Sequence, residues 1–368
     1  MKKIFTIGGA TQDIFIHYQN PESLVLKNKR ETKSYLLLEK GAKIEVDTLS
    51  YSTGGGATNA AFSFKKLGFD VIPIIKTGAG KAGQYIQDQL KDIGIDTSHI
   101  VKDKTTGTGL SYIIPSFEGD RTIFAYRGAN KKLTKKNVPL NEIKRGNCLY
   151  ITSLSGESSK ILLPITNHAK KNNVPVAVNP GASQLSGGSK ELEKSLKNID
   201  IFILNSQEAK IFLQSISKQL SPKELEKDIQ SCVSFEKLPD LIKSLVYIEN
   251  VCFNLKDFCK EMTSRGPSTI VVTNGEEGVY VAHKKTLYFY PSLPTKVVDT
   301  VGAGDAFGSC FSASIFTGTK IEKALVNGII NASSVISYED AKTGLLSWKE
   351  IEIRSKKINK SLMKKFKL

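Results

Sequence analysis

The sequence predicts an α/β protein, a doubly wound and mostly parallel sheet with helices on both faces, plus a small β-sheet lid. The main observation is that, from residue 148 onward, short apolar β-type runs alternate with helix-like segments. Alternation of this kind favours a parallel sheet covered on both sides. The second observation is that the strand-like runs before residue 50 have no helices between them, which indicates a separate small sheet. The alternating segments are Cys148–Thr152, Ile161–Lys171, Val174–Asn179, Glu191–Lys197 and Ile201–Leu204.

Composition limits the possible classes of protein. The 368 residues allow two domains or one large domain with an appendage, and we expect a single domain over 1–368. No apolar run approaches the roughly 20 residues that span a bilayer. The start, Met1–Phe5, runs into a strand without a cleavage site and predicts no signal peptide. The five cysteines show no CxxC pairing, so we expect reduced thiols and a cytoplasmic protein.

The net charge of +16 raises the question of nucleic acid. The lysines are spread along the chain, mostly beside glutamates, and no basic and aromatic residues interleave as a stacking platform would require. We therefore expect no nucleic-acid partner and no membrane partner. The basic surface would attract anionic substrates, and the lysines from Lys356 to Lys367 form a solvated end.

The first predicted strand, Lys3–Ile7, ends in Gly8-Gly9 and is followed by Asp13. An acid at the carboxyl end of the first strand of an α/β sheet lies where such sheets bind ligands. The alternative is that Asp13 caps a turn, and position alone leaves both open.

The lid strands are drawn from about 14–50 and 108–128. They include Ile14–His17 and Ser34–Leu38, with Lys27–Lys33 as a charged connection, and a hairpin around Glu118-Gly119-Asp120. An exposed lid sheet with free edges could pair across a homodimer. The hairpin strands are Gly109–Pro115 and Arg121–Tyr126.

Gly54-Gly55-Gly56 precedes an amphipathic helix, Ala60–Leu67. Consecutive glycines let the backbone approach a ligand closely, and we expect Gly54 and Gly55 to do so. Asn59, at the helix start, either offers its amide to a substrate hydroxyl or caps the helix.

A second glycine-rich segment, Gly78–Gly83, reads formally as GxGxxG and raises the alternative of a nicotinamide dehydrogenase. A dinucleotide site should show an acid at a strand tip about 20 residues on, but Asp103 lies in a polar stretch. A phosphate-binding Walker loop is excluded as well, because Ile75 stands where its first glycine is required and Ala82 where a serine or threonine is required. We interpret the segment as a structural turn from strand to helix.

Asn205-Ser206-Gln207-Glu208 follows the strand Ile201–Leu204. Asn205 could bind a phosphate oxygen and Glu208 a metal through water, whereas the alternative, which the sequence alone favours, is a helix N-cap with an acid three residues on. The polar stretch from Ser215 to Gly266 predicts a helical insertion on the surface.

Asp299–Phe307 predicts a glycine turn between a strand and a helix N-terminus. The backbone N–H groups of Gly302, Ala303 and Gly304 would converge on one spot, where the helix dipole adds positive potential suited to an anion. Asp305 beside them suits a base for a hydroxyl.

These motifs resemble the ribokinase-like (PfkB-type) carbohydrate and nucleoside kinases along nearly the whole chain. The resemblance implies a ribokinase-like fold and transfer of the ATP γ-phosphoryl group to a hydroxymethyl of a sugar or nucleoside. The matching segments are Asp13, GGGATN at Gly54–Asn59, NSQE at Asn205–Glu208, TNGEEG at Thr273–Gly278 and DTVGAGD at Asp299–Asp305.

The resemblance also implies roles. Asp305 would be the catalytic base, with the amides of Gly302, Ala303 and Gly304 as the anion hole. The remaining roles fall into three groups. Substrate hydroxyls would contact Asp13, Gly54, Gly55 and Asn59; ATP would contact Asn205, Thr273, Gly275, Gly278 and Asn331; Glu208 would hold Mg²⁺ through water and Asp299 a monovalent cation, usually K⁺.

Some residues depart from the ribokinase pattern. Gly56 stands where ribokinases carry a lysine, Gly80 where the G-x-D turn has its acid, and Ile151–Gly156 lacks a carboxylate near the sugar. Ala341–Gly344 matches the cation loop loosely. These departures argue against ribose itself as the acceptor. We expect another sugar, with a nucleoside as the alternative and a non-catalytic sugar- or nucleotide-binding protein as the third.

Overall fold

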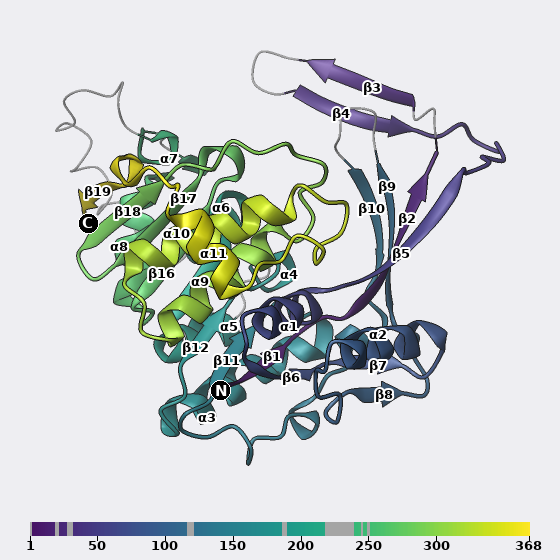
Figure 1. Cartoon of the computed structure of the whole chain (residues 1–368), viewed down its shortest axis with the longest axis horizontal. Helices are drawn as coiled ribbons and strands as arrows, with labels where there is room; N and C mark the ends of the chain where they lie inside the picture. Colours follow the sequence, from purple (N-terminus) through teal and green to yellow (C-terminus); the bar gives the residue numbers. More distant parts are fainter. Residues whose placement is uncertain are drawn as a thin grey trace.

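The computed structural model describes residues 2–18, 22–27, 32–115, 121–185, 190–217, 239–243, 246–248 and 251–368. Within them, the main sheet has nine strands in the order β19-β18-β17-β16-β13-β12-β11-β1-β6. Strands β6, β1, β11, β12, β13 and β16 run parallel, and β17, β18 and β19 add an antiparallel edge (Figure 1). The strands are β1 Lys3–Ile7, β6 Asp70–Ile74, β11 Cys148–Ile151, β12 Val176–Val178, β13 Ile201–Asn205, β16 Thr269–Thr273, β17 Val279–His283, β18 Thr286–Tyr290 and β19 Lys364–Lys367.

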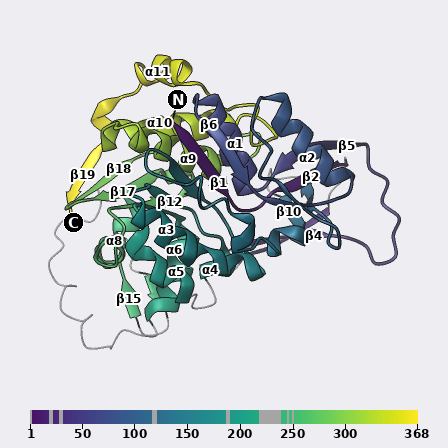
Figure 2. The same cartoon turned by 90° about the horizontal axis from the view of Figure 1, so that it is seen from below.

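Helices cover both faces of this sheet, as predicted. Figure 2 shows α1, α9, α10 and α11 on one side and α3, α5, α6 and α8 on the other. The α-helices are α1 Gly56–Lys66, α2 Lys81–Asp92, α3 Leu162–Lys171, α4 Ala182–Leu185, α5 Lys190–Ser195, α6 Ser206–Ser217, α7 Asp240–Lys243, α8 Leu255–Ser264, α9 Ala303–Phe316, α10 Ile321–Val335 and α11 Trp348–Ser355. The 3₁₀ helices are η1 Gly128–Lys131, η2 Lys135–Asn137, η3 Gly156–Ile161, η4 Leu196–Asn198, η7 Gly275–Glu277 and η8 Lys360–Leu362.

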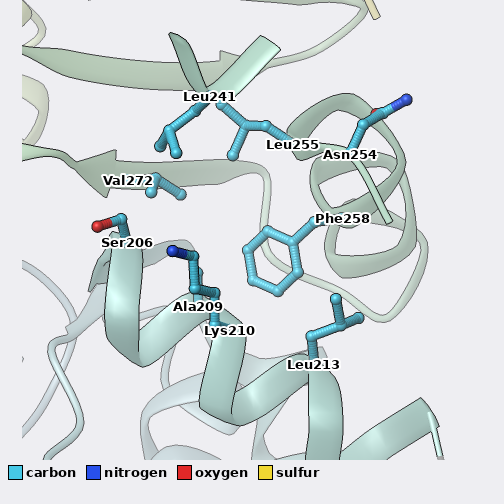
Figure 3. A pocket seen from close by; sticks show the side chains of 9 residues that line it. All are labelled: Ser206, Ala209, Lys210, Leu213, Leu241, Asn254, Leu255, Phe258 and Val272. Carbon is cyan, nitrogen blue, oxygen red and sulfur yellow. The ribbon is translucent and has the colours of Figure 1, made fainter. Parts of the chain in front are cut away.

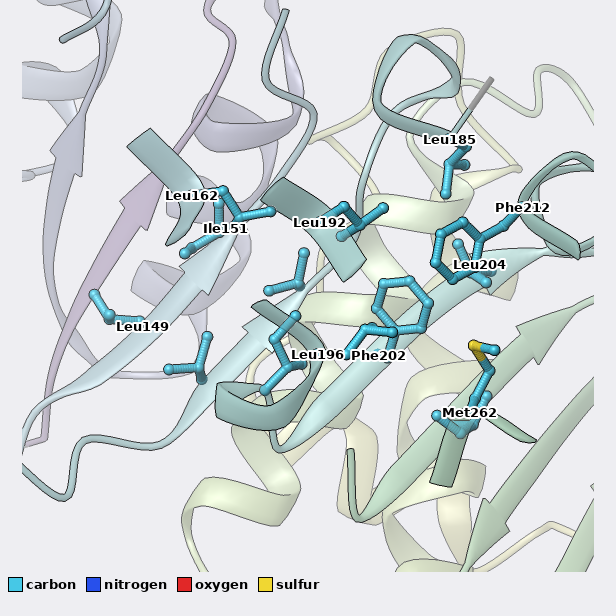
Figure 4. Packing of buried hydrophobic residues seen from close by; sticks show 14 of the residues in the cluster. Leu149, Ile151, Leu162, Leu185, Leu192, Leu196, Phe202, Leu204, Phe212 and Met262 are labelled. Atoms are coloured by element: carbon cyan, nitrogen blue, oxygen red, sulfur yellow. The ribbon is translucent and has the colours of Figure 1, made fainter. Parts of the chain in front are cut away.

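Each face of the sheet has its own apolar core. On the α3, α5 and α6 side, leucines and phenylalanines from strands and helices interlock (Figure 4). Phe202 of β13 and Phe212 of α6 meet edge to face, with ring centroids 5.7 Å apart. Continuous apolar runs such as Ile201–Leu204 are buried on both faces because helices lie on both sides.

The lid is a four-stranded sheet in the order β10-β9-β2-β5, which stands beside the main body (Figure 1). The predicted strands at 14–17, 34–38, 109–115 and 121–126 are found, whereas the strands at 22–27 and 48–54 were not predicted. Thr48–Gly54 is polar and mostly exposed, so it carries little apolar alternation to predict a strand. The predicted turn at Glu118–Asp120 lies outside the described residues, as does most of the predicted connection 27–33. The strands are β2 Thr11–His17, β5 Thr48–Gly54, β9 Gly109–Pro115, β10 Arg121–Tyr126 and, in a separate hairpin, β3 Glu22–Lys27 and β4 Thr32–Leu37.

The stretch from 215 to 266 differs from the predicted surface helices in its described parts. It contains a hairpin of β14 Val246–Ile248 and β15 Val251–Phe253, and α8 buries Phe258, Cys259 and Met262 against the main sheet. In the sequence, the helical spacing of the apolar residues in α8 was obscured by the polar residues around them. Residues 218–238 of the predicted insertion lie outside the described residues. Between α6 and α8 lies a small apolar pocket (Figure 3).

The Gly78–Gly83 segment is the structural turn that was predicted. Strand β7, Lys76–Gly78, pairs with β8, Val101–Asp103, and α2 follows at Lys81. A side-chain carbon at Gly83 would lie 2.1 Å from the carbonyl oxygen of Gly78, so this glycine serves close packing of the chain on itself. Asp103 accepts hydrogen bonds from Thr105 and Thr106 and pairs with Lys76. Among the described residues, no helix has the length and apolar character needed to cross a bilayer.

Candidate active site

The centre of the site is the start of α9. Gly302 is the N-cap, with φ +77° in the left-handed region that favours glycine. A side-chain carbon there would lie 2.3 Å from Cβ of Ala341, so only glycine fits. The turn then leads into a helix that is buried over most of its length, which fixes the direction of its N-terminus.

The backbone N–H groups predicted to form an anion hole differ in their hydrogen bonds. The N–H of Ala303 donates to the carbonyl oxygen of Thr300 at 3.3 Å, a long bond within the turn. Within the described part of the chain, the N–H groups of Gly304 and Asp305 have no acceptor, as is usual for the first turn of a helix. Gly304 is exposed, and nothing lies within 4 Å of the position its Cβ would take. The donors therefore face open space at the positive end of the helix dipole.

Asp305 receives a hydrogen bond from Asn59, whose Nδ2 lies 2.8 Å from its Oδ2. Asn59 lies one turn inside α1, where Gly55 is the N-cap, so Asn59 does not cap the helix. The Asp305 carboxyl group is surrounded by protein although the residue as a whole is partly exposed. Burial raises the pKa of Asp305 to about 6, against the lowering effect of Asn59.

Asp13 lies inside lid strand β2 and is buried, so it does not cap a turn. Thr11 donates a hydrogen bond to it at 2.8 Å. Burial raises the pKa of Asp13, and hydrogen bonds from Ser111 and Thr11 oppose this. A Cβ on Gly54, across the strand pair, would lie 1.8 Å from Oδ2 of Asp13, so Gly54 makes room for the carboxylate.

Gly55 joins β5 to α1 with φ +92°. A Cβ at this position would lie 2.5 Å from the carbonyl oxygen of Gly9, in the turn after β1. Gly54 and Gly55 thus let three chain segments meet beside Asp13. The contacts that these glycines make are with the protein backbone and the Asp13 carboxylate, and their predicted approach to a ligand stays a prediction.

Lys342 also belongs to this region and was not identified as a site residue. Its ammonium group donates to Thr53 O and to Ser52 Oγ, the latter at 3.1 Å, and lies 4.9 Å from the ring centre of Phe62. Burial lowers its pKa to about 8, although Asp13 and Asp340 oppose this. The loose match of Ala341–Gly344 to a cation loop was the only signal in the sequence.

A cavity of about 630 Å³ opens on one side of the α9 turn. Three of the predicted ATP contacts, Thr273, Gly275 and Gly278, line it together with Ala303 and Gly304. A neighbouring cavity of about 210 Å³ is lined by Asn205, Glu208 and Asp305 and shares Thr273 and Gly304 with the first. The two cavities therefore meet at the predicted anion hole.

Asn205 and Glu208 form the reciprocal cap that the sequence allowed. The N–H of Glu208 donates to Asn205 Oδ1 and the N–H of Asn205 to Glu208 Oε2, both at 2.8 Å. Both residues still line the cavity next to Asp305. Burial raises the pKa of Glu208, so a cation beside it would stabilise its charged form. In the described part of the chain, no three acidic, histidine or cysteine side chains form a metal cluster.

Asn331 is placed differently from the prediction. Its Nδ2 donates to Ala306 O at 2.9 Å, and its Oδ1 accepts from the N–H of Leu346 at 3.0 Å. The side chain is fully buried and joins α10 to α9 and to the loop after α10. Its helix neighbours Ala332 and Ser333 line the large cavity instead, because one residue along a helix turns the side chain by about 100°.

Asp299 is paired with a lid residue that sequence reasoning missed. Arg121, the first residue of β10, places Nη1 at 2.8 Å from Asp299 Oδ1 and donates to Thr300 Oγ1 at 3.0 Å. The same Asp299 oxygen accepts from the N–H of Val301 at 2.6 Å. No local pattern could link residues so far apart in the sequence.

Comparisons with known proteins show which family and fold the chain shares. Residues 26–235 and 253–348 match the family described as pfkB family carbohydrate kinase. The chain is 24% identical over 294 residues to a ribokinase of Staphylococcus aureus, covering 78% of this chain and 84% of the relative. It is 26% identical over 316 residues to a 5-dehydro-2-deoxygluconokinase of Listeria monocytogenes, covering 84% and 88%.

Two solved structures share the fold over nearly the whole chain. Arabidopsis thaliana ribokinase complexed with ribose and ATP has a TM-score of 0.72 at 19% identity and covers 97% of this chain and 99% of its own. Burkholderia thailandensis nucleoside kinase in complex with inosine has a TM-score of 0.71 at 17% identity, covering 96% and 98%.

Proposed function

Because the chain belongs to the pfkB family of carbohydrate kinases, we propose that it moves the γ-phosphoryl group of ATP to a hydroxymethyl group of a sugar. At the family level it is an ATP-dependent sugar or nucleoside kinase. The observation that supports the finer proposal is the position of Asp305, which lines the smaller cavity next to Gly304, a residue that both cavities share, and lies beside the free N–H groups of the α9 turn.

Asp305 is the base in this proposal. It accepts the proton of the acceptor hydroxyl as the oxygen attacks phosphorus, and a pKa of about 6 leaves it ionised at neutral pH. The hydrogen bond from Asn59 fixes its orientation. The N–H groups of Gly304 and its neighbours offset the negative charge that develops on the phosphoryl oxygens.

The acceptor would bind on the Asp13 side and ATP on the Thr273 side. Buried Asp13 would be a hydrogen-bond acceptor for substrate hydroxyls, and the missing side chain of Gly54 leaves room for its carboxylate. The large cavity, lined by Gly275 and Gly278, has room for a nucleotide.

Mg²⁺ fits the donors that are present. Oxygen ligands are what Mg²⁺ prefers, and it usually binds through one or two carboxylates, water and substrate phosphates. Glu208 would hold it through water and Asn205 would contact a phosphate oxygen. When bound, Mg²⁺ neutralises charge on the phosphates.

A nucleoside acceptor is the second candidate. The supporting observation is the fold shared with a nucleoside kinase whose structure contains inosine. A sugar is favoured by the matched family and by relatives named ribokinase and 5-dehydro-2-deoxygluconokinase. A third possibility, a binding protein without catalysis, would keep the fold and lose ADP formation.

One experiment separates the three. ADP release would be followed with ATP and Mg²⁺ over a panel of ribose, deoxyribose, 5-dehydro-2-deoxygluconate, other hexose derivatives, adenosine and inosine. We expect turnover with one sugar or sugar acid that Asp305→Asn abolishes. Turnover with nucleosides alone would favour the second candidate. ATP binding without any ADP release would contradict the proposed activity.

A further inference from the structure

A lid side chain contacts the turn that precedes α9. Arg121 begins β10, and its guanidinium contacts two consecutive residues of the segment before the anion hole, Asp299 and Thr300. The pair is largely protected from water, since the Arg121 and Asp299 side chains are 18% and 17% exposed. A guanidinium is planar, permanently charged and suited to holding two acceptors at once.

The two residues that Arg121 holds shape the turn. Asp299 accepts the N–H of Val301, and the carbonyl oxygen of Thr300 accepts the N–H of Ala303. Both bonds fix the backbone between residue 299 and the N-cap of α9. Movement of Asp299 or Thr300 would therefore change where the N–H of Gly304 points.

A monovalent cation was predicted at Asp299, and the residues present do not fit one. Oδ1 of Asp299 is already shared by a guanidinium and a backbone N–H. The Arg121–Asp299 pair is neutral overall, and a K⁺ placed against Asp299 would be repelled by the guanidinium at short range. The partners of Asp299 are therefore those of an ion pair and not those of a cation-binding site.

We propose that Arg121 takes the place of the monovalent cation, as a positioning residue that holds the turn from the lid. Two consequences follow. Folding and activity do not depend on K⁺, and the anion hole reaches its working geometry only when the lid lies over the site. The second consequence depends on the proposed kinase function, whereas the first does not.

The first test is thermal melting in KCl and in choline chloride at matched ionic strength. Wild-type protein should melt at the same temperature in both salts. Arg121→Gln should melt lower in choline chloride and be raised by KCl specifically, because K⁺ can then bind the exposed carboxylate. Arg127→Gln, an exposed arginine at the other end of β10, is the matched control and should behave as wild type.

The second test is turnover under the same salts. Arg121→Gln should lose about tenfold or more in kcat, with K⁺ restoring part of it, whereas Arg121→Lys should stay insensitive to K⁺. If Arg121→Gln does not fold, Arg121→Lys still tests the proposal, because it keeps a positive charge beside Asp299 and loses the simultaneous contact with Asp299 and Thr300.

Two results would overturn the proposal. One is a wild-type melting temperature that rises in K⁺ relative to choline. The other is an Arg121→Gln protein that has wild-type stability and no response to K⁺. Both are read from melting alone, so they remain decisive if no acceptor is found and the proposed function fails.

Discussion

Asn59 and Asp305 are 246 residues apart in sequence, and one hydrogen bond of 2.8 Å between them joins the N-terminal parts of α1 and α9. The bond orients the carboxylate that we propose as the base and lowers its pKa against the larger effect of burial. Because it lies between α1, which follows the lid, and α9, which carries the anion hole, it connects the two halves of the site.

Replacement of the proposed base gives the most direct prediction. Asp305→Asn keeps the shape of the side chain and removes its ability to take a proton, so kcat should fall by about 10²- to 10⁴-fold. ATP binding, measured by titration calorimetry, should persist. The control is Asp92→Asn on exposed α2. Unchanged turnover in Asp305→Asn would remove Asp305 as the base.

The same substitution, Asp305→Asn, should change how the stability of the folded protein depends on pH. The pKa of Asp305 is about 6 in the folded protein, above its ordinary value of 3.8, so its contribution to stability is full below about 4 and is lost as pH rises through 6. Asp305→Asn should therefore melt higher than wild type at pH 7, with the difference shrinking toward pH 4. A pH-independent difference would contradict the raised pKa.

Catalysis should fall on the acid side because Asp305 becomes protonated. The profile of kcat/KM should decline below about pH 6. Asn59→Ala removes the hydrogen bond that lowers this pKa, so the decline should move to higher pH. A decline at the same pH in both proteins would show that another group titrates.

Gly54→Ala tests the space around Asp13. The added Cβ would lie 1.8 Å from the carboxylate, which must move, so KM for the acceptor should rise by about tenfold while KM for ATP stays. Gly80→Ala is a matched control, because nothing lies within 4 Å of its Cβ position. Equal kinetics in the two variants would argue against Asp13 as an acceptor contact.

The exposed lid face leads to a prediction about assembly. Large apolar side chains, among them Tyr51 (52% exposed) and Phe124 (55%), lie on lid strands, and we propose a homodimer through the lid. Light scattering after size exclusion should give a dimer mass for wild type and a monomer mass for Phe124→Asp. Ile353→Asp, on exposed α11, should remain a dimer. A monomeric wild type would rule the interface out.

The sequence predicted the parts of the site that are contiguous in the chain. The turn from Asp299 to Asp305 carries its own glycine and helix start, so its existence and its place before α9 are encoded locally. The parallel sheet was likewise readable, since runs such as Ile201–Leu204 are apolar throughout.

The remaining contacts could not be predicted because they depend on tertiary packing. Arg121 and Lys342 reach their partners across 178 and 289 residues, and neither has a local pattern that names them. Asn331 was misplaced by one step of helix rotation, which a motif match does not resolve. The sequence alone left open whether Asn59 caps the helix, because the position of the N-cap, Gly55, is visible only in the structure.

Strand β5 ends at Gly54 and α1 begins at Gly56, so a single residue, Gly55, separates the lid from the helix that contacts the base. No slack loop absorbs movement between them. A rotation of the lid about Gly55 would therefore shift the start of α1, which carries Asn59. Under the proposed function, an acceptor that displaces the lid strands would thereby also displace the residue that donates a hydrogen bond to Asp305.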